Sequence, residues 1–583
     1  ISDRQLIEAL YFLIGKADTS FFVRTGVNIA LFQGAILGQG TDEQIAEYLP
    51  RLEKHSIIGC FCMTELGTGS YIQSFETTAT YLSDKDEFVI HSPTLTSTKW
   101  WIGGAAQTAT HGIVFAQLIV NGENLGTHNF IVQLRDENFN PCPGITIGDV
   151  GPKRGDEGVD NGWVRFNQVH IPRTQMLMKW SRVTADGKYE KSELAQLAYG
   201  ALVPGRVAIS ANIVDSAQKA LTIATRYNTI RDQHTMKGKC LLDYTTQQER
   251  LIGGIASAYA FHFAIDQLKK MAEQVIQELA KKDVTHLKDL HNLAAGIKGF
   301  AAFWGNDAIH ASIFSMGGHG YSSLSALPKI LNDFAPSIPY EGDAIVLAQQ
   351  TASYLVKAAG ALLKGKTLEG ESIQYLNHMS KVEKLECKAD AKKDLTLTDL
   401  QDAAEWLALI LIKDASNDVI KDYLKGRDTD EAWNAHQLKT IKASKAHIMY
   451  LVIKYFNQTI VNELTNGLGD AAGEWIPIMT QLAELFALKH LEEFMTYFFE
   501  NEYFEASRGQ MIRKQILHLY ASLRPYANPL VDAWGIPDII LGSPLGRYDG
   551  ELYENYFKAV NETPQDLKPE YWEEYLKPLF NKK

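Results

Sequence analysis

A glutamate followed directly by a glycine is the residue of this chain best suited to acid–base chemistry. Glu341 stands in the segment 340–343 (YEGD), after Pro336 and Pro339 and before an apolar helical stretch. A carboxylate can act as a general base when burial raises its pKa. The same position also suits a solvated residue that caps the following helix, and the sequence alone leaves both interpretations open.

Three glycine-containing segments could bring backbone N–H groups against a flat or phosphorylated ligand. They are 63–70 (MTELGTGS), 99–104 (KWWIGG) and 317–320 (GGHG). Glycine permits close approach of the backbone, and tryptophan offers a large apolar surface. Each segment taken alone also fits an ordinary turn, and the paired tryptophans also fit a core. The first segment does not match the dinucleotide fingerprint, which needs a strand–turn–helix context and a third glycine.

Several other chemistries are excluded by the sequence. It contains no HExxH zinc helix. Cys60 and Cys62 lack the second ligand pair of a tetrahedral zinc site, so we expect two buried small residues and no metal. The five cysteines are scattered and odd in number, which indicates a reducing compartment rather than a disulfide framework.

Composition bounds the class of protein. The 583 residues are 45% hydrophobic and 22% charged, which is typical of a globular chain of several domains. The net charge of −12 argues against a nucleic-acid binder held by phosphate contacts. The longest conspicuous apolar run, 406–412, is about a third of the length of a membrane span, so we expect a soluble intracellular protein.

The elements that must position these residues follow the order helix, strand, helix. Residues 1–55 have a helical pattern interrupted at Gly15, Gly26 and 38–40, and a capping box at 41–44 opens a helix to Leu49. Short β-branched segments follow, with a hairpin signal at Asn121-Gly122, and predict an antiparallel barrel or sandwich. They are 77–82, 88–90, 113–120 and 130–134. The glycine- and proline-rich stretch 136–162 predicts irregular structure. Long helices are predicted over 256–280, 287–313, 400–423, 431–457 and 478–502.

Taken together, the motifs resemble the peroxisomal acyl-CoA oxidases, relatives of the acyl-CoA dehydrogenases, over nearly the whole chain. The matching blocks are 63–67 (MTELG), 76–80 (ETTAT), 99–104 (KWWIGG), 160–162 (DNG), 171–173 (IPR), 317–322 (GGHGYS) and 340–343 (YEGD). The resemblance implies a mainly α protein with a central β domain. Its expected parts are an N-terminal α domain at 1–55, expected to be incomplete, a β domain at 56–180, and C-terminal α domains at 181–360 and 361–583. The last of these distinguishes the oxidases from the shorter dehydrogenases.

The resemblance also implies a reaction and a set of site residues. The reaction is oxidation of a fatty acyl-CoA to trans-2-enoyl-CoA with FAD, which dioxygen reoxidises to give hydrogen peroxide. The family's catalytic base corresponds to Glu341. Positions that contact FAD correspond to Thr64 and Gly103 from the β domain, Gly317 and Gly318 near the diphosphate, and Arg231 and Gln233, which resemble a segment reaching the neighbouring subunit's flavin. The implied assembly is a homodimer with composite flavin sites, and the implied location is the peroxisome, although the chain ends in NKK rather than a Ser-Lys-Leu type of signal.

Two other functions stay open, and two departures from the family pattern motivate the second of them, a binding or assembly role. Thr68 stands where relatives commonly have histidine, and Ala344 stands where they commonly have asparagine. One alternative is a dehydrogenase that passes electrons to a protein acceptor. Another is a catalytically weak homologue that acts in binding or assembly. Acyl chain length follows from helix packing, so no motif predicts it.

Overall fold

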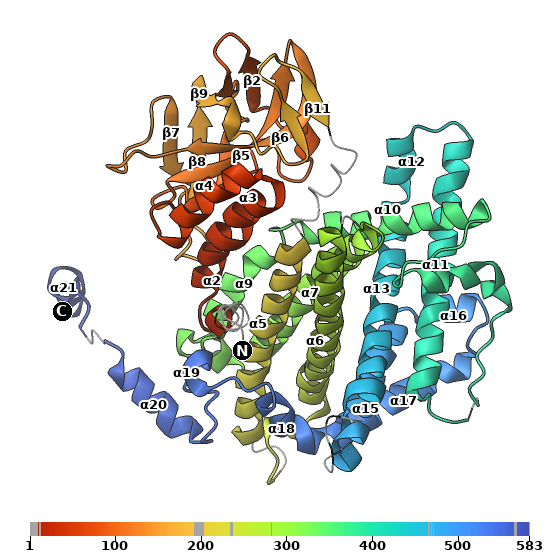
Figure 1. Cartoon of the computed structure of the whole chain (residues 1–583). Coiled ribbons are helices and arrows are strands. Elements are labelled where there is room, and N and C mark those ends of the chain that lie inside the picture. The colour runs from red at the N-terminus through yellow and green to blue at the C-terminus, as the bar shows by residue number, and fades with distance from the viewer. Residues whose placement is uncertain are drawn as a thin grey trace.

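The computed structural model describes residues 10, 13–191, 203–233, 237–281, 283–390, 392–464, 467, 469, 472–564 and 568–581. A β domain with short helices on one side lies against a larger helical body, and a C-terminal arm extends away from that body (Figure 1). The predicted order of helix, strand and helix is therefore confirmed.

The N-terminal helical segment is more continuous than the glycine pattern predicts. It consists of α2 (Thr19–Gly26), the π-helix η1 (Val27–Gln33), α3 (Gly34–Gln39) and α4 (Asp42–Glu53). The predicted break at Gly26 is wrong, because Gly26 keeps right-handed helical angles and leads directly into η1. The capping box is confirmed, with Thr41 and Gln44 bonding each other's backbone N–H groups. The helix does not stop before Pro50, however, but carries this proline inside and runs to Glu53.

One stretch of this segment also has the length and composition of a membrane span. Thr19–Gln39 has a mean hydropathy of 1.3 with a third of it buried, and it is the one such stretch among the described residues. Core helices of globular proteins meet the same criteria, so the finding is weak evidence. Phe32 in this stretch is fully buried and lies directly over Gly59 of the β domain, where any side chain would collide with its ring.

The β domain consists of two main sheets and a small ribbon. Its strands are β1 (Gly59–Cys62), β2 (Thr78–Leu82), β3 (Glu87–His91), β4 (Lys99–Gly103), β5 (His111–Val120), β6 (Glu123–Gln133), β7 (Ile145–Asp149), β8 (Asn161–Phe166), β9 (Val169–Pro172), β10 (Ser181–Val183) and β11 (Tyr189–Lys191). One sheet has six strands, with the path β1-β5-β2-β3-β9 and β6 on β5, and another has the order β4-β8-β7. The β5–β6 hairpin turns at Asn121 and Gly122, both of which have positive φ, as the sequence predicts.

Two expectations for the strands of this domain need correction. The sheet is mixed rather than antiparallel, because β5 pairs in parallel with both β1 and β2. The stretch 136–162 contains a regular strand, β7, which pairs with β8. Beyond the predicted boundary at residue 180, β10 and β11 form a hairpin that reaches Lys191, and the domain boundaries themselves stay a prediction.

The first helical unit after the β domain is built on three long helices. These are α5 (Val203–Ile230), α6 (Thr245–Ala280) and α7 (Leu287–Ser315), followed by α8 (Gly318–Tyr321), α9 (Leu327–Phe334) and α10 (Ala344–Leu363). Short 3-10 turns lie at η5 (Leu241–Asp243), η6 (Ser323–Ser325) and η7 (Ala335–Ser337). Alanine and glycine let α5 and α7 pack side by side along their length (Figure 1). The two helices run in the same direction, so their first turns lie at one end of this unit and their last turns at the other.

A second helical unit packs against α10 and continues to the C-terminus. It comprises η8 (Gln374–Lys384), α11 (Leu397–Leu424), α12 (Thr429–Ala435), α13 (Gln437–Thr459), η9 (Ile460–Leu464), α15 (Ala472–Glu493), α16 (Met495–Glu500), α17 (Ala506–Leu523), η11 (Arg524–Tyr526), α18 (Ala527–Asp532) and α19 (Asp538–Leu541). The arm carries α20 (Leu552–Glu562), η12 (Trp572–Leu576) and α21 (Lys577–Phe580). The predicted helix 431–457 is thus two helices, divided at His436, and the predicted helix 478–502 is divided at Phe494.

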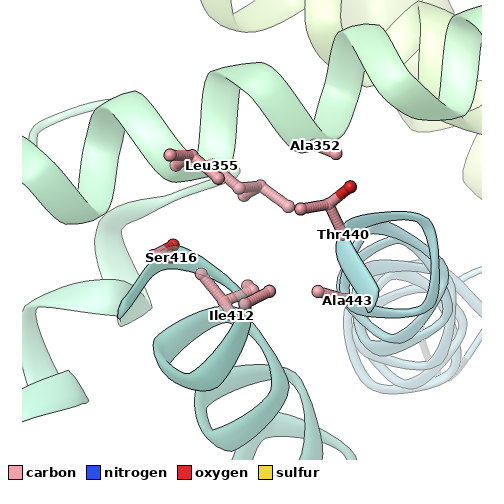
Figure 2. A pocket seen from close by; sticks show the side chains of 8 residues that line it. Ala352, Leu355, Ile412, Ser416, Thr440 and Ala443 are labelled. Carbon is pink, nitrogen blue, oxygen red and sulfur yellow. The ribbon is translucent and has the colours of Figure 1, made fainter. Parts of the chain in front are cut away.

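The junction of the two units is closely packed. Leu355 of α10, Ile412 of α11 and Thr440 of α13 point toward one another (Figure 2). The space between these helices leaves no room for a water molecule. Helix α10, which begins directly after Glu341 and its neighbours, is therefore anchored along its length by the second unit.

Candidate active site

Glu341 lies in the turn between η7 and α10. Its backbone is left-handed, with φ of 53°, and Gly342 follows with φ of 104°. The cap of α10 is Asp343, whose carboxylate accepts hydrogen bonds from the backbone N–H groups of Ile345 and Val346. The helix-cap interpretation of Glu341 is therefore wrong, and its side chain is available for another role.

The carboxyl group of Glu341 lies against the first turn of α5. A Cβ built on Gly205 would be 3.4 Å from Oε2, which places the carboxyl group in van der Waals contact with this turn. The residue keeps some accessible surface, yet burial around the carboxyl group raises its pKa, and Arg206 and Lys298 oppose that rise. Among the described residues, none donates a hydrogen bond to the carboxyl oxygens. A buried carboxylate with free lone pairs is suited to accept a proton.

Thr64 and Gly103 are brought together at one edge of the β domain. The Thr64 hydroxyl donates to the carbonyl of Trp100 (2.5 Å), and the Trp100 N–H donates to the carbonyl of Thr64 (3.0 Å). These bonds attach the loop that begins at Thr64 to β4, which ends at Gly103. The structure thus places the two predicted β-domain contacts on adjoining backbone segments.

A buried ion pair, which the sequence analysis did not identify, fixes this loop from behind. The Nζ of Lys99 lies 3.0 Å from Oε1 of Glu65, and neither side chain has exposed surface. Glu65 also accepts hydrogen bonds from the N–H groups of Glu76 and Thr77, and Lys99 donates to the carbonyls of Met63 and Phe115. The only signal in the sequence was a lysine beginning an otherwise apolar strand.

The paired tryptophans do not form a core. Trp101 has φ of 66° and is 58% exposed, and Trp100 is partly exposed. The register of β4 against β8 shifts between Lys99 and Ile102, which turns Trp101 outward. This edge therefore presents the exposed ring of Trp101, which offers an aromatic surface to a flat ligand, whereas Gly104 is buried under Arg24.

Arg231, Gln233, Gly317 and Gly318 gather near the other end of α5 and α7. Gly317 has φ of 57°, both glycines are exposed, and a Cβ on either would meet no atom within 4 Å. The Tyr227 hydroxyl and Nδ1 of His319 are 3.0 Å apart, which ties α5 to this turn. Arg231 lies close enough to lower the pKa of His319, after burial as the larger cause. Open glycine backbone beside a guanidinium suits the diphosphate of FAD.

The group formed by Arg231, Gln233, Gly317 and Gly318, here called the Arg231 group, lies far from Glu341 within one chain. Arg206, beside Glu341, and Arg231 are 25 residues apart on or next to α5. At about 1.5 Å of rise per residue, this separation is about 37 Å along the helix. The Arg231 group therefore does not join the Glu341 site of its own chain.

The side chains do not form a metal site in the part of the chain that the structure describes. Among the described residues, no group of three histidine, cysteine or acidic side chains is placed to hold an ion. Cys60 and Cys62 are buried in the β-domain core, with their sulfurs 3.6 Å apart.

Known families match three parts of the chain. The family models are described as "Acyl-CoA oxidase" (residues 396–581), "Acyl-CoA oxidase, C-alpha1 domain" (199–356) and "Acyl-CoA dehydrogenase, middle domain" (60–169). The chain is 35% identical to peroxisomal acyl-coenzyme A oxidase 1 of Rattus norvegicus, over 97% of this chain and 86% of that protein.

Solved structures agree with these matches. The fold is similar to that of acyl-CoA oxidase 1 from Arabidopsis thaliana, with a TM-score of 0.90 and 34% identity over 96% of this chain and 85% of that one. It is also similar to acyl-CoA oxidase-1 from Caenorhabditis elegans, solved in complex with FAD and ATP, with a TM-score of 0.88 and 32% identity over 96% and 83% of the two chains. From its sequence and its fold, the chain belongs to the acyl-CoA oxidase family, whose members are FAD-dependent enzymes that oxidise fatty acyl-CoA.

Proposed function

We propose that Glu341 is the catalytic base of this acyl-CoA oxidase and that dioxygen is the electron acceptor. The observation that carries this proposal is the position of the Glu341 carboxyl group, which is buried, free of hydrogen bonds from described residues, and held against Gly205 by a left-handed backbone. Burial raises its pKa, which makes the carboxylate a stronger base once it has lost its proton.

In the proposed reaction, the carboxylate of Glu341 removes a proton from the α-carbon of the acyl thioester. The electron pair of that C–H bond becomes the second bond between the α- and β-carbons, and the β-hydrogen departs with its own electron pair. When bound, FAD supplies the two-electron acceptor for this hydride. The nearby cations Arg206 and Lys298 favour the ionised carboxylate, because both lower its pKa against the larger effect of burial.

We further propose that each flavin site is shared by two copies of the chain. Thr64 and Gly103 would hold FAD from the subunit that supplies Glu341. Arg231, Gln233, Gly317 and Gly318 would contact the flavin's diphosphate side from the neighbouring subunit. The separation of about 37 Å along α5 supports this arrangement. A homodimer with two equivalent composite sites satisfies the geometry.

The chain's location is proposed from its relatives, several of which are named as peroxisomal enzymes. We propose that this chain also acts in the peroxisome, in the first step of fatty-acid β-oxidation.

An oxygen-consumption assay tests the choice of acceptor. With an acyl-CoA of suitable length and dioxygen as sole acceptor, the purified protein should release one hydrogen peroxide for each enoyl-CoA formed. Bleaching of the flavin without peroxide would instead support a dehydrogenase that uses a protein acceptor. A protein that neither binds FAD nor changes its spectrum with acyl-CoA would support the binding or assembly role suggested by Thr68 and Ala344.

A further inference from the structure

A fully buried lysine holds the turn that carries Glu341. Lys298 of α7 has no exposed surface. Its Nζ donates to three backbone carbonyls, those of Ile338 (3.1 Å), Tyr340 (2.7 Å) and Gly342 (2.7 Å). These acceptors flank Glu341 on both sides, one of them directly before it and one directly after it.

The number of acceptors indicates the protonation state of the lysine. An ammonium group has three N–H donors, whereas a neutral amine has two and presents a lone pair. Three carbonyls around one nitrogen are therefore all satisfied only by the ammonium form. Loss of the proton would leave one buried carbonyl without its partner, which favours movement of the turn.

Gly299, next to Lys298, shows that α7 packs closely against the residues that follow the turn. A Cβ on Gly299 would lie 3.0 Å from the carbonyl oxygen of Ala344, so glycine permits this close approach. The turn itself is strained at Glu341, whose φ of 53° is uncommon for a residue with a side chain. A strained turn needs fixed partners, and Lys298 supplies three of them.

We propose that Lys298 is a positioning residue, whose ammonium group fixes the left-handed turn and thereby holds the Glu341 carboxyl group over Gly205. The inference rests on the proposed role of Glu341 as the base. Lys298 does not touch the acyl chain in this account; it acts through the backbone on either side of the base. Misplacement of a reacting group by about 1 Å can cost about 100-fold in rate.

The surroundings of Lys298 make its hold on the turn depend on pH. Burial lowers the pKa of Lys298 to about 7; Glu341 and Asp343 of the turn oppose the shift, and Arg206 of α5 adds to it. Deprotonation near neutral pH should therefore slow the chemical step on the alkaline side. The ionisation of Glu341 has the opposite effect on the rate, because its carboxylate must be unprotonated and rising pH therefore speeds the chemical step.

The test compares Lys298→Met, Lys298→Arg and a control, Lys288→Met, on the same helix. Lys288 is exposed and donates no hydrogen bond to the described residues, and its ammonium group lies over the ring of Tyr354, 5.4 Å from the centroid. This contact is outside the turn that carries Glu341, so replacing Lys288 should leave the rate of flavin reduction unchanged. Each holoenzyme is mixed with acyl-CoA without oxygen, and flavin bleaching is followed at several pH values. Lys298→Met should slow the limiting rate by about 100-fold while flavin content and acyl-CoA affinity stay at parent values.

The arginine variant supplies a readout that a purely structural role would not change. A guanidinium remains charged at all accessible pH values, so Lys298→Arg should lose the alkaline decline that the parent shows between about pH 7 and pH 9. The same alkaline decline in Lys298→Arg and in the parent would overturn the inference. This comparison decides the question even if Lys298→Met does not fold.

A double variant separates this inference from the proposed function. If Lys298 acts only through Glu341, then Lys298→Met should add no further slowing in a Glu341→Gln background. Equal slowing in both backgrounds, or a parent rate for Lys298→Met beside a slow Glu341→Gln, would overturn the role of Lys298 alone. A parent rate for Glu341→Gln would instead overturn the proposed base.

Discussion

Lys99 and Glu65 show how one buried pair can stabilise the loop that carries Thr64. Both side chains are removed from water, and their hydrogen bonds connect the loop at 63–68 with three other backbone segments. Burial lowers the pKa of Lys99, and Glu65 opposes this shift. Removing one partner would leave the other charge buried and unpaired, which is the costly case.

Lys99→Met should therefore destabilise the protein by about 3 to 5 kcal/mol. Its melting temperature and its retention of FAD should both fall. The exposed Lys85, in the β2–β3 turn, offers a control, because Lys85→Met should leave both properties unchanged. A Lys99→Met protein as stable as this control would contradict the account of the loop.

The sequence predicted Glu341 as the candidate base but not the residues that position it. The sequence pattern could not decide whether Glu341 is a base or a helix cap, because Asp343, two residues later, suits a helix cap equally well. The structure decides for Asp343 because its carboxylate bonds the first N–H groups of α10. Arg206 and Lys298 lie far from Glu341 in the sequence, and no local pattern predicts contacts over such distances.

At the scale of elements, a β-domain loop packs tightly against α9. A Cβ on Gly155 would lie 2.3 Å from the carbonyl oxygen of Asn332, so only glycine fits there. The next residue, Asp156, is 5% exposed and donates its backbone N–H to the carboxylate of Asp333. One carboxyl oxygen of Asp156 has no hydrogen-bond partner. Burial, with a smaller contribution from Asp333, raises the pKa of Asp156 to about 6.

This loop gives a prediction about stability and pH. The folded protein binds a proton at Asp156 more tightly than the unfolded chain does, so this residue lowers stability as pH rises from about 4 to about 6. Asp156→Asn removes the charge, and asparagine tolerates the positive φ. The variant should exceed the parent by on the order of 2 kcal/mol at pH 8 and match it near pH 3. If the variant and the parent have equal melting temperatures at pH 8 as well as at pH 3, the charge of Asp156 does not destabilise the folded protein.

Local elements were predictable from the sequence, and long-range pairings were not. The hairpin at Asn121-Gly122 and the capping box at Thr41 depend on neighbouring residues, and both are confirmed. The parallel pairing of β1 with β5 joins strands about 50 residues apart, so the periodicity of each strand does not show whether they pair in parallel or antiparallel. Strand β7 was missed because glycines and prolines surround it, although its own five residues pair regularly with β8.

At the scale of the whole molecule, the proposed sharing of each flavin site by two subunits can be tested by complementation. The variants Glu341→Gln and Arg231→Ala should each be impaired as homodimers. In a mixed dimer, one composite site would combine an intact Glu341 with an intact Arg231 from the neighbour. Random mixing by co-refolding or coexpression should then restore activity to roughly a quarter of the parental sites.

The alternative of a site within one chain predicts a different result. Each site of the mixed dimer would then carry one of the two changes, and no activity would return. A control mixture of Glu341→Gln with itself sets the baseline. The fold as a whole was predictable because the motif blocks span the chain. The placement of Arg231 about 37 Å along α5 from Arg206, the residue beside Glu341, required the structure.

The most direct test of the central claim is flavin reduction by Glu341→Gln in the absence of oxygen. Glutamine keeps the shape of the side chain but cannot take the α-proton, so bleaching should slow by about 100- to 10,000-fold. The variant should remain yellow and should still bind acyl-CoA, because the proposed flavin contacts lie at Thr64, Gly103 and the neighbouring subunit. A Glu341→Gln protein that bleaches its flavin at the parent rate on mixing with acyl-CoA would contradict the assignment of Glu341 as the base.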